Sequence, residues 1–280
     1  MACESFPGDR IAGGTGAMSE GNEQPPGIEV RTYFVRERNA LVARAEFGEL
    51  YVDYYLHQSQ YGMRHRPAED QMIKEALAAM TLHSASRPRN EITAWTIHFV
   101  NPLVNVFVTG DNQRGTVTGQ VFTEDVKDDG KNLFMSDTVR GHSPARRSVV
   151  QLPENEIFPS VEHYYGQSEQ MPARLFRHDE EDFVLVCAHP DCDMPWFESL
   201  DDGAIRALDQ TEDLSLLERR FYRWECGCDE KRMMGVLAPI MLRDAGSLFG
   251  DDPAIRMSCP RCGARYTITR VSMEAHVAGK

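Results

Sequence analysis

Four of the seven cysteines in this 280-residue chain form two close pairs near its C-terminal end. One residue separates Cys226 from Cys228, two residues separate Cys259 from Cys262, and 30 residues lie between the pairs. Outside a short secreted scaffold, such pairs are typical of metal binding rather than of disulfides. A loop of this length can fold back and place four thiolates around one ion. The spacing therefore predicts a zinc site with these four ligands.

The second pair lies in the sequence Cys-Pro-Arg-Cys-Gly, where a tight turn lets both sulfurs face one ion and Gly263 relieves crowding. Tyr266 and Ile268 then fit a strand that leaves this turn. In zinc-finger peptides the binding of zinc supplies about 10–16 kcal/mol, which is effectively folding energy. Loss of the ion on oxidation would therefore unfold a small module. The residues alone allow a purely structural ion, an oxidation switch, or a pair of incidental or redox-active thiols.

The other three cysteines carry weaker signals. Cys187 ends an apolar run and is expected to be a small buried hydrophobic residue. Cys192 lies between Asp191 and Asp193, whose charges oppose thiolate formation. Cys3 is expected to be an incidental thiol. None of the three is predicted to be functional.

Composition and periodicity predict an α+β fold in five parts. Residues 1–28 are rich in glycine and proline and read as a disordered tail. Residues 29–178 are expected to form the α+β core, residues 179–225 an acidic and partly helical linker, residues 226–272 the zinc domain, and residues 273–280 a short tail. In the core, short alternating segments follow one another without intervening helices, which favours a β-meander beside helices over a doubly wound sheet.

Within the core we expect a strand between residues 30 and 47, a helix over 51–61, and a second helix in which Met72, Ile73, Ala76, Leu77 and Met80 share one face. Three strands follow around residues 95–99, 104–108 and 117–121, with a turn at 109–112 between the last two. An amphipathic helix begins after Pro153 and ends before Pro172. Residues 183–187 are a further strand candidate.

The net charge of −13 is concentrated in one segment. Residues 179–225 contain 14 acidic and 4 basic side chains, so this stretch repels itself and its fold should be marginal. It also contains Leu214, Leu217, Phe221 and Trp224 at helical spacing, which predicts an amphipathic helix leading into Cys226. The acidity disfavours a polyanion-binding role for the whole chain. No apolar run is long enough to span a membrane and no secretion signal begins the chain, so we expect a cytoplasmic protein.

The cysteine spacing resembles the signature of the heat shock protein 33 family of redox-regulated chaperones. A second segment, residues 161–176, is also similar to that family, with a tyrosine-rich helix end followed by Ser168-Glu169-Gln170, an apolar residue, Pro172 and Leu175. The two motifs occur in the expected order, about 55 residues apart. The resemblance covers roughly residues 29–272.

The resemblance implies a chaperone that works without ATP and holds unfolding client proteins. It implies that the reduced, zinc-bound form is largely inactive. Oxidation is then expected to release zinc, pair the cysteines as disulfides, unfold the C-terminal module and linker, and favour a homodimer. Carried over by position, Cys226, Cys228, Cys259 and Cys262 are both the zinc ligands and the switch.

Two other classes of function are compatible with parts of the sequence. A zinc-ribbon module that binds nucleic acid or the ribosome is suggested by Arg256, Arg261, Arg265 and Arg270, although no aromatic-basic stacking pattern accompanies them. An enzyme is disfavoured because no catalytic motif is present, and because four sulfur ligands leave zinc without an open coordination position. His163, His178 and His189 are scattered and are explained as solvated or core histidines.

Overall fold

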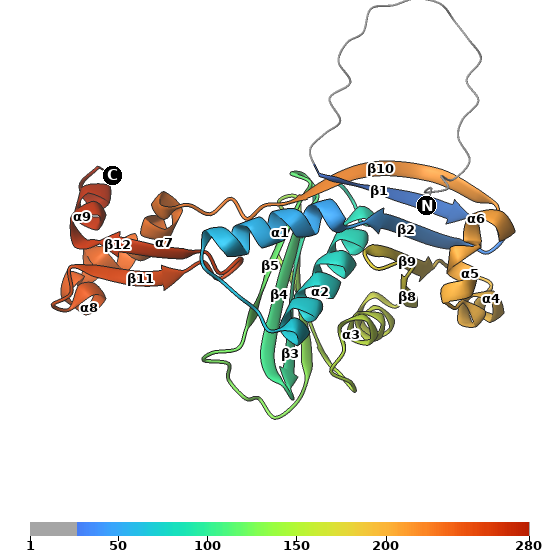
Figure 1. Cartoon of the computed structure of the whole chain (residues 1–280), viewed down its shortest axis with the longest axis horizontal. Coiled ribbons are helices and arrows are strands. Elements are labelled where there is room, and N and C mark those ends of the chain that lie inside the picture. The colour runs from blue at the N-terminus through green and yellow to red at the C-terminus, as the bar shows by residue number, and fades with distance from the viewer. Residues whose placement is uncertain (1–26, 280) are drawn as a thin grey trace, which may run out of the picture.

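The computed structural model describes residues 27–279, which form a large mixed sheet with helices and a small module at the C-terminal end (Figure 1). The strands are β1 (Ile28–Val35), β2 (Ala40–Glu46), β3 (Glu91–Val100), β4 (Leu103–Asp111), β5 (Thr116–Phe122), β6 (Leu133–Arg140), β7 (Arg146–Gln151), β8 (Ala173–Arg177), β9 (Asp182–Ala188), β10 (Leu214–Trp224), β11 (Ala254–Ser258) and β12 (Arg265–Thr269). The helices are α1 (Gly48–Gln60), α2 (Pro67–Ala85), α3 (Ile157–Tyr164), α4 (Met194–Ser199), α5 (Asp202–Arg206), α6 (Leu208–Thr211), α7 (Glu230–Arg243), α8 (Ala245–Phe249) and α9 (Arg270–Ala278), with a π-helical turn η1 (Tyr165–Glu169) after α3. The predicted α+β class is confirmed.

Ten strands form one sheet in the order β7-β6-β3-β4-β5-β10-β1-β2-β9-β8. The predicted meander is the half made of β3 to β7, where each neighbouring pair is antiparallel. Its β4–β5 turn occupies residues 112–115, slightly later than expected. The predicted strand between residues 30 and 47 is two antiparallel strands, β1 and β2. Strand β10 joins the halves, because it pairs antiparallel with β1 and makes a short parallel contact with β5.

The central helix α2 forms where the apolar spacing predicted it. Pro67 stands at its first position, and the Glu69 carboxylate accepts the backbone N–H of Arg66 at 2.9 Å, which caps the helix. Ile73, Ala76, Leu77 and Met80 are all buried on the face toward the sheet. Helices α1, α2 and α3 therefore cover one face of the sheet, and this side holds the main core.

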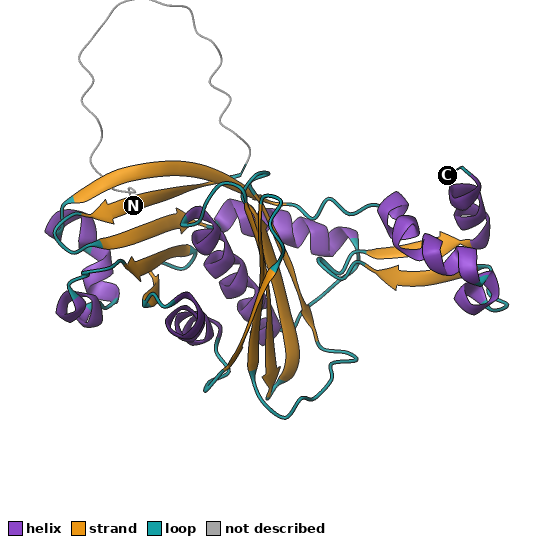
Figure 2. Ribbon diagram, turned by 180° about the vertical axis from the view of Figure 1, so that it is seen from behind, coloured by secondary structure: helices purple, strands orange, loops and turns teal. Residues whose placement is uncertain are grey.

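A second, smaller core lies on the opposite face of the same sheet. Because side chains alternate along a strand, β2 directs Ala43 and Ala45 toward the main core and Ala40 and Val42 away from it. The short helices α4–α6 cover the outward residues with Phe197, Leu200, Ile205 and Leu208. Figure 2 shows these helices at the end of the molecule opposite to the C-terminal module.

The predicted helix containing Leu214, Leu217, Phe221 and Trp224 is wrong, because residues 214–224 form strand β10. All eight residues of β1 pair with β10, from Ile28 with Tyr222 to Val35 with Leu214. Leu217 is exposed, whereas Tyr222 and Trp224 are buried. Pairing with a distant strand outweighs the helical preference of this leucine-, glutamate- and arginine-rich segment. The linker is helical only in α4–α6.

The structure also corrects the two predicted tails. Ile28, assigned to the first tail, begins β1 and is buried. The rest of that tail, with Cys3, lies outside the described residues apart from Gly27. Residues 273–278, predicted as a second tail, belong to α9, and Met273 is fully buried. Among the helices of residues 27–279, none is long and apolar enough to cross a membrane.

Candidate metal centre

The structure brings together the four cysteines that the spacing singled out. Cys226 and Cys228 lie in the connection between β10 and α7, and Cys259 and Cys262 lie in the turn between β11 and β12. The four sulfur atoms are all within 4.8 Å of one another. The Sγ atoms of Cys226 and Cys259 are 3.7 Å apart, and those of Cys228 and Cys262 are 3.4 Å apart.

These separations fit a four-coordinate thiolate site. Zinc–sulfur bonds of about 2.3 Å in a tetrahedron place the sulfurs roughly 3.8 Å apart. A disulfide would require about 2.05 Å, and all four cysteines are free thiols. Three of the four residues are buried. The donor set and its spacing are therefore those of a site that can hold one metal ion.

The turn that carries the second pair has the backbone that its sequence predicts. The N–H of Cys259 donates to the carbonyl of Ala264 at 2.8 Å, and the N–H of Gly263 donates to the carbonyl of Cys259 at 2.9 Å. Gly263 has a φ of +74°, which disfavours any residue with a Cβ. A Cβ there would also lie 2.8 Å from Gln120 and 2.9 Å from Met63, both in the large domain.

The thiols of the centre affect one another's protonation. A hydrogen bond with the Cys226 thiol lowers the pKa of Cys228 to about 7. The Tyr266 hydroxyl donates to the Cys228 sulfur at 3.1 Å and further favours its thiolate. Hydrogen bonds from neighbouring thiols also lower the pKa of Cys259. The same hydrogen bonds raise the pKa values of Cys226 and Cys262, so within the cluster the thiolate form is favoured at Cys228 and Cys259; the thiolate is the form that binds metals and reacts with oxidants.

Residues of the large domain, which the sequence did not indicate, hold the centre in place. The Nε2 of His57, in the last turn of α1, lies 3.2 Å from the carbonyl oxygen of Cys262 as hydrogen-bond donor. The His57 ring also packs on Trp224 and Tyr61, with centroids 4.2 and 4.8 Å away. Tyr61 in turn faces Tyr266, 6.0 Å between centroids. No sequence signal marks the contacts of His57 with Cys262 and of Tyr61 with Tyr266, because each joins residues about 200 positions apart.

The remaining sequence candidates lie elsewhere. Cys187 is buried in β9, where desolvation raises its pKa to about 12. Partial burial, and the charge of Asp193, raise the pKa of Cys192. His178 pairs with Asp182 at 3.4 Å, and His189 packs edge-on to Phe34. Arg270 donates to the carbonyl of Gly250 and covers the Phe249 ring, so it helps to hold α8.

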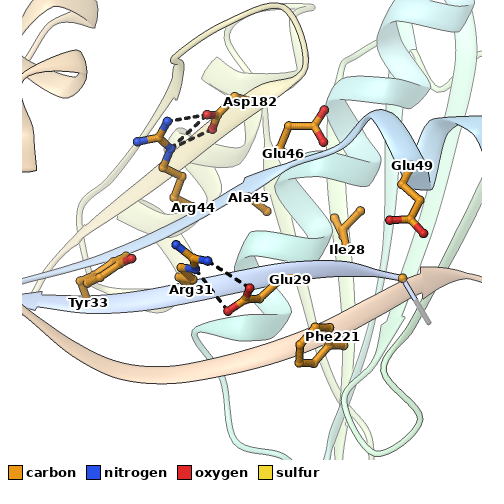
Figure 3. Close-up of a pocket in the computed structure, with 11 residues that line it drawn as sticks. Ile28, Glu29, Arg31, Tyr33, Arg44, Ala45, Glu46, Glu49, Asp182 and Phe221 are labelled. Atoms are coloured by element: carbon orange, nitrogen blue, oxygen red, sulfur yellow. Dashed lines mark hydrogen bonds and ion pairs between the residues drawn. The ribbon is translucent and has the colours of Figure 1, made fainter. Parts of the chain in front are cut away.

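A cavity of about 340 Å³ lies on the outer face of β1, β2 and β10 (Figure 3). Both arginines of its lining are in ion pairs, Arg31 with Glu29 at 3.2 Å and Arg44 with Asp182 at 2.6 Å. Glu46 and Glu49 also line it. Glu49, at the start of α1, marks its edge, whereas the cysteine centre contacts the other end of that helix. The cavity is therefore separate from the cysteine centre.

Comparisons with known proteins agree with this architecture. The model of the Hsp33 protein family matches residues 52–186 and 193–269. A 33 kDa chaperonin from Proteus mirabilis (strain HI4320) is 25% identical over 260 residues, covering 79% of this chain and 88% of that protein. A 33 kDa chaperonin from Yersinia pestis (strain Pestoides F) is 22% identical, covering 74% and 82%. The crystal structure of the 33 kDa chaperonin from Thermotoga maritima superposes with a TM-score of 0.66 at 14% identity, covering 90% of this chain and 98% of that one.

Fold and centre together define an α+β protein with one large sheet and a small C-terminal module that gathers four cysteines. The family match includes both of these parts. The chain belongs to the Hsp33 family, as its two motifs predicted, and the relatives named above are called chaperonins rather than enzymes.

Proposed function

We propose that this protein is a redox-regulated chaperone that holds unfolding client proteins without ATP. In this proposal Cys226, Cys228, Cys259 and Cys262 bind one zinc ion in the resting form and act as the switch. The observation that carries it is the convergence of four thiols in a module docked on a chaperone-family fold. Cytoplasmic location and dimerisation on oxidation are parts of the same proposal.

The small module is suited to act as a switch, because few contacts other than those at the four cysteines hold it together. Its buried apolar side chains outside the cysteines are few: Met233, Ala238, Phe249, Ala264, Ile268 and Met273. A core of this size supplies only a few kcal/mol, so the ion would supply most of the folding energy. When bound, zinc would hold the four thiolates in one fixed geometry.

Oxidation would remove that support. Two thiolates, one hydrogen peroxide and two protons give one disulfide and two water molecules, so two equivalents of peroxide would oxidise all four sulfurs. A disulfide is a poor zinc ligand, because the thiolate is the binding form.

Loss of the module's structure would expose part of the large domain. The Cys262 carbonyl would leave His57, and the aromatic contacts with Tyr61 and Trp224 would open. The same helix α1 already exposes Val52, Tyr55 and Leu56, which recur at helical spacing. Uncovering its end would extend this apolar stripe, and contiguous exposed apolar surface is what an unfolding client can bind.

The acidic segment, residues 179–225, covers a second surface that clients could bind. Helices α4–α6 pack on the outward side chains of β1, β2, β8 and β9. Their interior is small and their surroundings strongly negative, so their docking should be weak. Release of these helices would expose a largely aliphatic sheet face, a second candidate surface for clients.

The decisive experiment measures zinc content and suppression of client light scattering on one sample before and after peroxide. We expect one zinc per reduced chain, zinc release on oxidation, and protection only by the oxidised protein. Cys259→Ser should bind zinc weakly, and its protection should not depend on peroxide. Cys192→Ser, which removes a thiol outside the centre, should behave as the wild type. Equal protection by reduced and oxidised wild-type protein would overturn the proposal.

A further inference from the structure

A second cavity, of about 260 Å³, lies where three segments of the large domain meet. Its walls come from the β4–β5 turn, from the connection between α2 and β3, and from the end of β10. Five arginines line it, and the lining contains no acidic residue: Arg89, Arg114, Arg219, Arg220 and Arg223. This cluster of positive charge contrasts with the net charge of −13 of the whole chain.

Carboxylates outside the lining balance these arginines only in part. Glu218 is shared between Arg89 and Arg220. Glu225 pairs with Arg223 at 2.7 Å, and Glu29 reaches Arg219 at 3.4 Å while also pairing with Arg31. Among residues 27–279, no carboxylate forms an ion pair with Arg114, whose side chain is exposed. The cavity therefore presents several guanidinium groups with donors to spare.

The walls of the cavity are held by contacts that do not involve a ligand. Arg220 donates to the backbone carbonyls of Arg87 at 2.6 Å and Ser84 at 3.3 Å. Asn112 donates to the carbonyls of Ser84 and Pro88 and accepts the hydroxyl of Tyr222 at 2.9 Å. The N–H of Arg223 also donates to the carbonyl of Gly115 at 3.0 Å, so hydrogen bonds hold the β4–β5 turn both to β10 and to the α2–β3 connection. The arginine backbones are arranged in advance, which lowers the entropy lost on binding.

We propose that this cavity binds a short chain of linked phosphates, such as a diphosphate or triphosphate group. Planar guanidinium groups match phosphate oxygens in paired hydrogen bonds, and several around one space favour more than one phosphate. The cavity's size suits a compact anion. An extended polyanion would have to pass Glu218, Glu225 and the acidic remainder of the chain, so a nucleic acid is disfavoured.

The site also implies an effect on stability. It exists only while β10 is paired with β1 and lies beside β5, because the three segments form its walls together. A ligand that binds only this arrangement stabilises it by mass action. Arg223 lies three residues before Cys226, so the anion would hold the strand that leads into the cysteine centre.

The test is calorimetric titration of the reduced full-length protein with inorganic tripolyphosphate, in about 0.1 M salt to screen diffuse attraction. We expect saturable binding with one site per chain and a raised melting temperature. Arg114→Gln should weaken binding about tenfold or more, the loss of one charged hydrogen-bonding group. Arg256→Gln removes an equal charge from β11 in the C-terminal module and should leave affinity within about twofold.

Tripolyphosphate also chelates metals, and the two variants separate that effect. Arg114 Nη1 lies 3.8 Å from where a Cβ would stand at Gly227, between Cys226 and Cys228, so the zinc content of wild type and both variants is measured before and after the titration. Weaker binding by Arg114→Gln at an unchanged zinc content reports the cavity. No saturable binding, or equal weakening in Arg114→Gln and Arg256→Gln, would overturn the proposal. Tighter binding of single-stranded RNA than of tripolyphosphate, with the same dependence on Arg114, would also overturn it in favour of a nucleic-acid surface. None of these outcomes depends on the chaperone proposal.

Discussion

The hydrogen bond from Tyr266 to Cys228 is the one side-chain contact beyond the thiols that reaches a sulfur of the centre among the described residues. Tyr266→Phe keeps the ring and removes this donor. Partners outside the first ligand shell usually contribute about 10–100-fold to metal affinity. We expect zinc affinity to fall about tenfold and peroxide to release zinc faster, because a thiolate without this donor is more nucleophilic. Competition with a chromogenic chelator measures both.

Tyr55→Phe is the matched control. Its hydroxyl donates to Asp70 at 2.6 Å, away from the cysteines. It should leave zinc affinity and the rate of release unchanged. If Tyr266→Phe also left both unchanged, the tyrosine would only pack beside the centre.

His83 predicts how stability depends on pH. It is buried in α2 against Trp95, its Nδ1 is 2.6 Å from the Tyr165 hydroxyl, and desolvation, with the charges of Arg87 and Arg146, lowers its pKa well below 6.5. As pH falls below about 6.5, the unfolded chain takes up a proton that the folded chain does not. The free energy of unfolding should therefore decrease toward low pH, by up to about 1.4 kcal/mol per pH unit for this group, and be unaffected above that pH.

Urea unfolding followed between about pH 5 and pH 8 measures this slope. His65 and His178 also have lowered pKa values through burial, so the wild-type slope will exceed that of one group. His83→Gln should have a lower free energy of unfolding at every pH. The slope of that free energy against pH should be smaller by the contribution of about one proton. His142→Gln, at an exposed position, should keep the full slope. An unchanged slope in His83→Gln would show that His83 is protonated in the folded protein.

At the scale of elements, the role of helices α4–α6 in covering one face of the sheet is the part of the proposal most easily tested. Phe197 is buried in the second core, and Arg174 donates to the carbonyls of Phe197, Glu198 and Leu200 at the end of α4. Phe197→Ala should weaken docking of α4–α6 by about 3–5 kcal/mol. If the covered sheet face binds clients, the reduced variant should suppress light scattering without peroxide.

Glu198→Ala alters the next residue, which is exposed, and should stay inactive until oxidised. Hydrogen exchange of residues 194–211 reports whether the helices have opened. Opening without client protection in Phe197→Ala would exclude this sheet face as the client surface.

The same elements show what a sequence can and cannot predict. Helix α2 was predicted from one apolar face because its burial follows the helical period of its own residues. Strand β10 was predicted as a helix because its local pattern fits one, while its structure is set by pairing with β1 about 190 residues earlier. The π-helical turn η1 after α3 also leaves no periodic signal.

At the scale of the whole molecule, the cysteine centre was predictable because thiol spacing records its own chemistry. The position at which the centre docks on the large domain was not predictable from the sequence. The contacts of Gly263 with Met63 and Gln120, and of His57 with the Cys262 carbonyl, depend on how the module and the large domain pack against each other. Nothing in the local sequence of α1 indicates that its last turn faces the cysteine centre.

The small core of the C-terminal module and the large core of the rest predict how the molecule would respond to removal of the proposed zinc ion. A strong chelator under reducing conditions should unfold α7–α9 and the β11–β12 hairpin, because few apolar groups hold them. Most of the main core lies between the sheet and α1–α3, and only a small part of it comes from the module, so β3 and β4 should stay protected. In hydrogen exchange, peptides from residues 230–278 should therefore exchange fast, and peptides from residues 91–111 should not change. Peptides around His57 should exchange faster than before, because they lose the Cys262 contact. Returning zinc should restore the original pattern.

Uniform loss of protection would instead mean that the module and the large domain unfold as one unit, and zinc would then stabilise the whole fold rather than the part that switches.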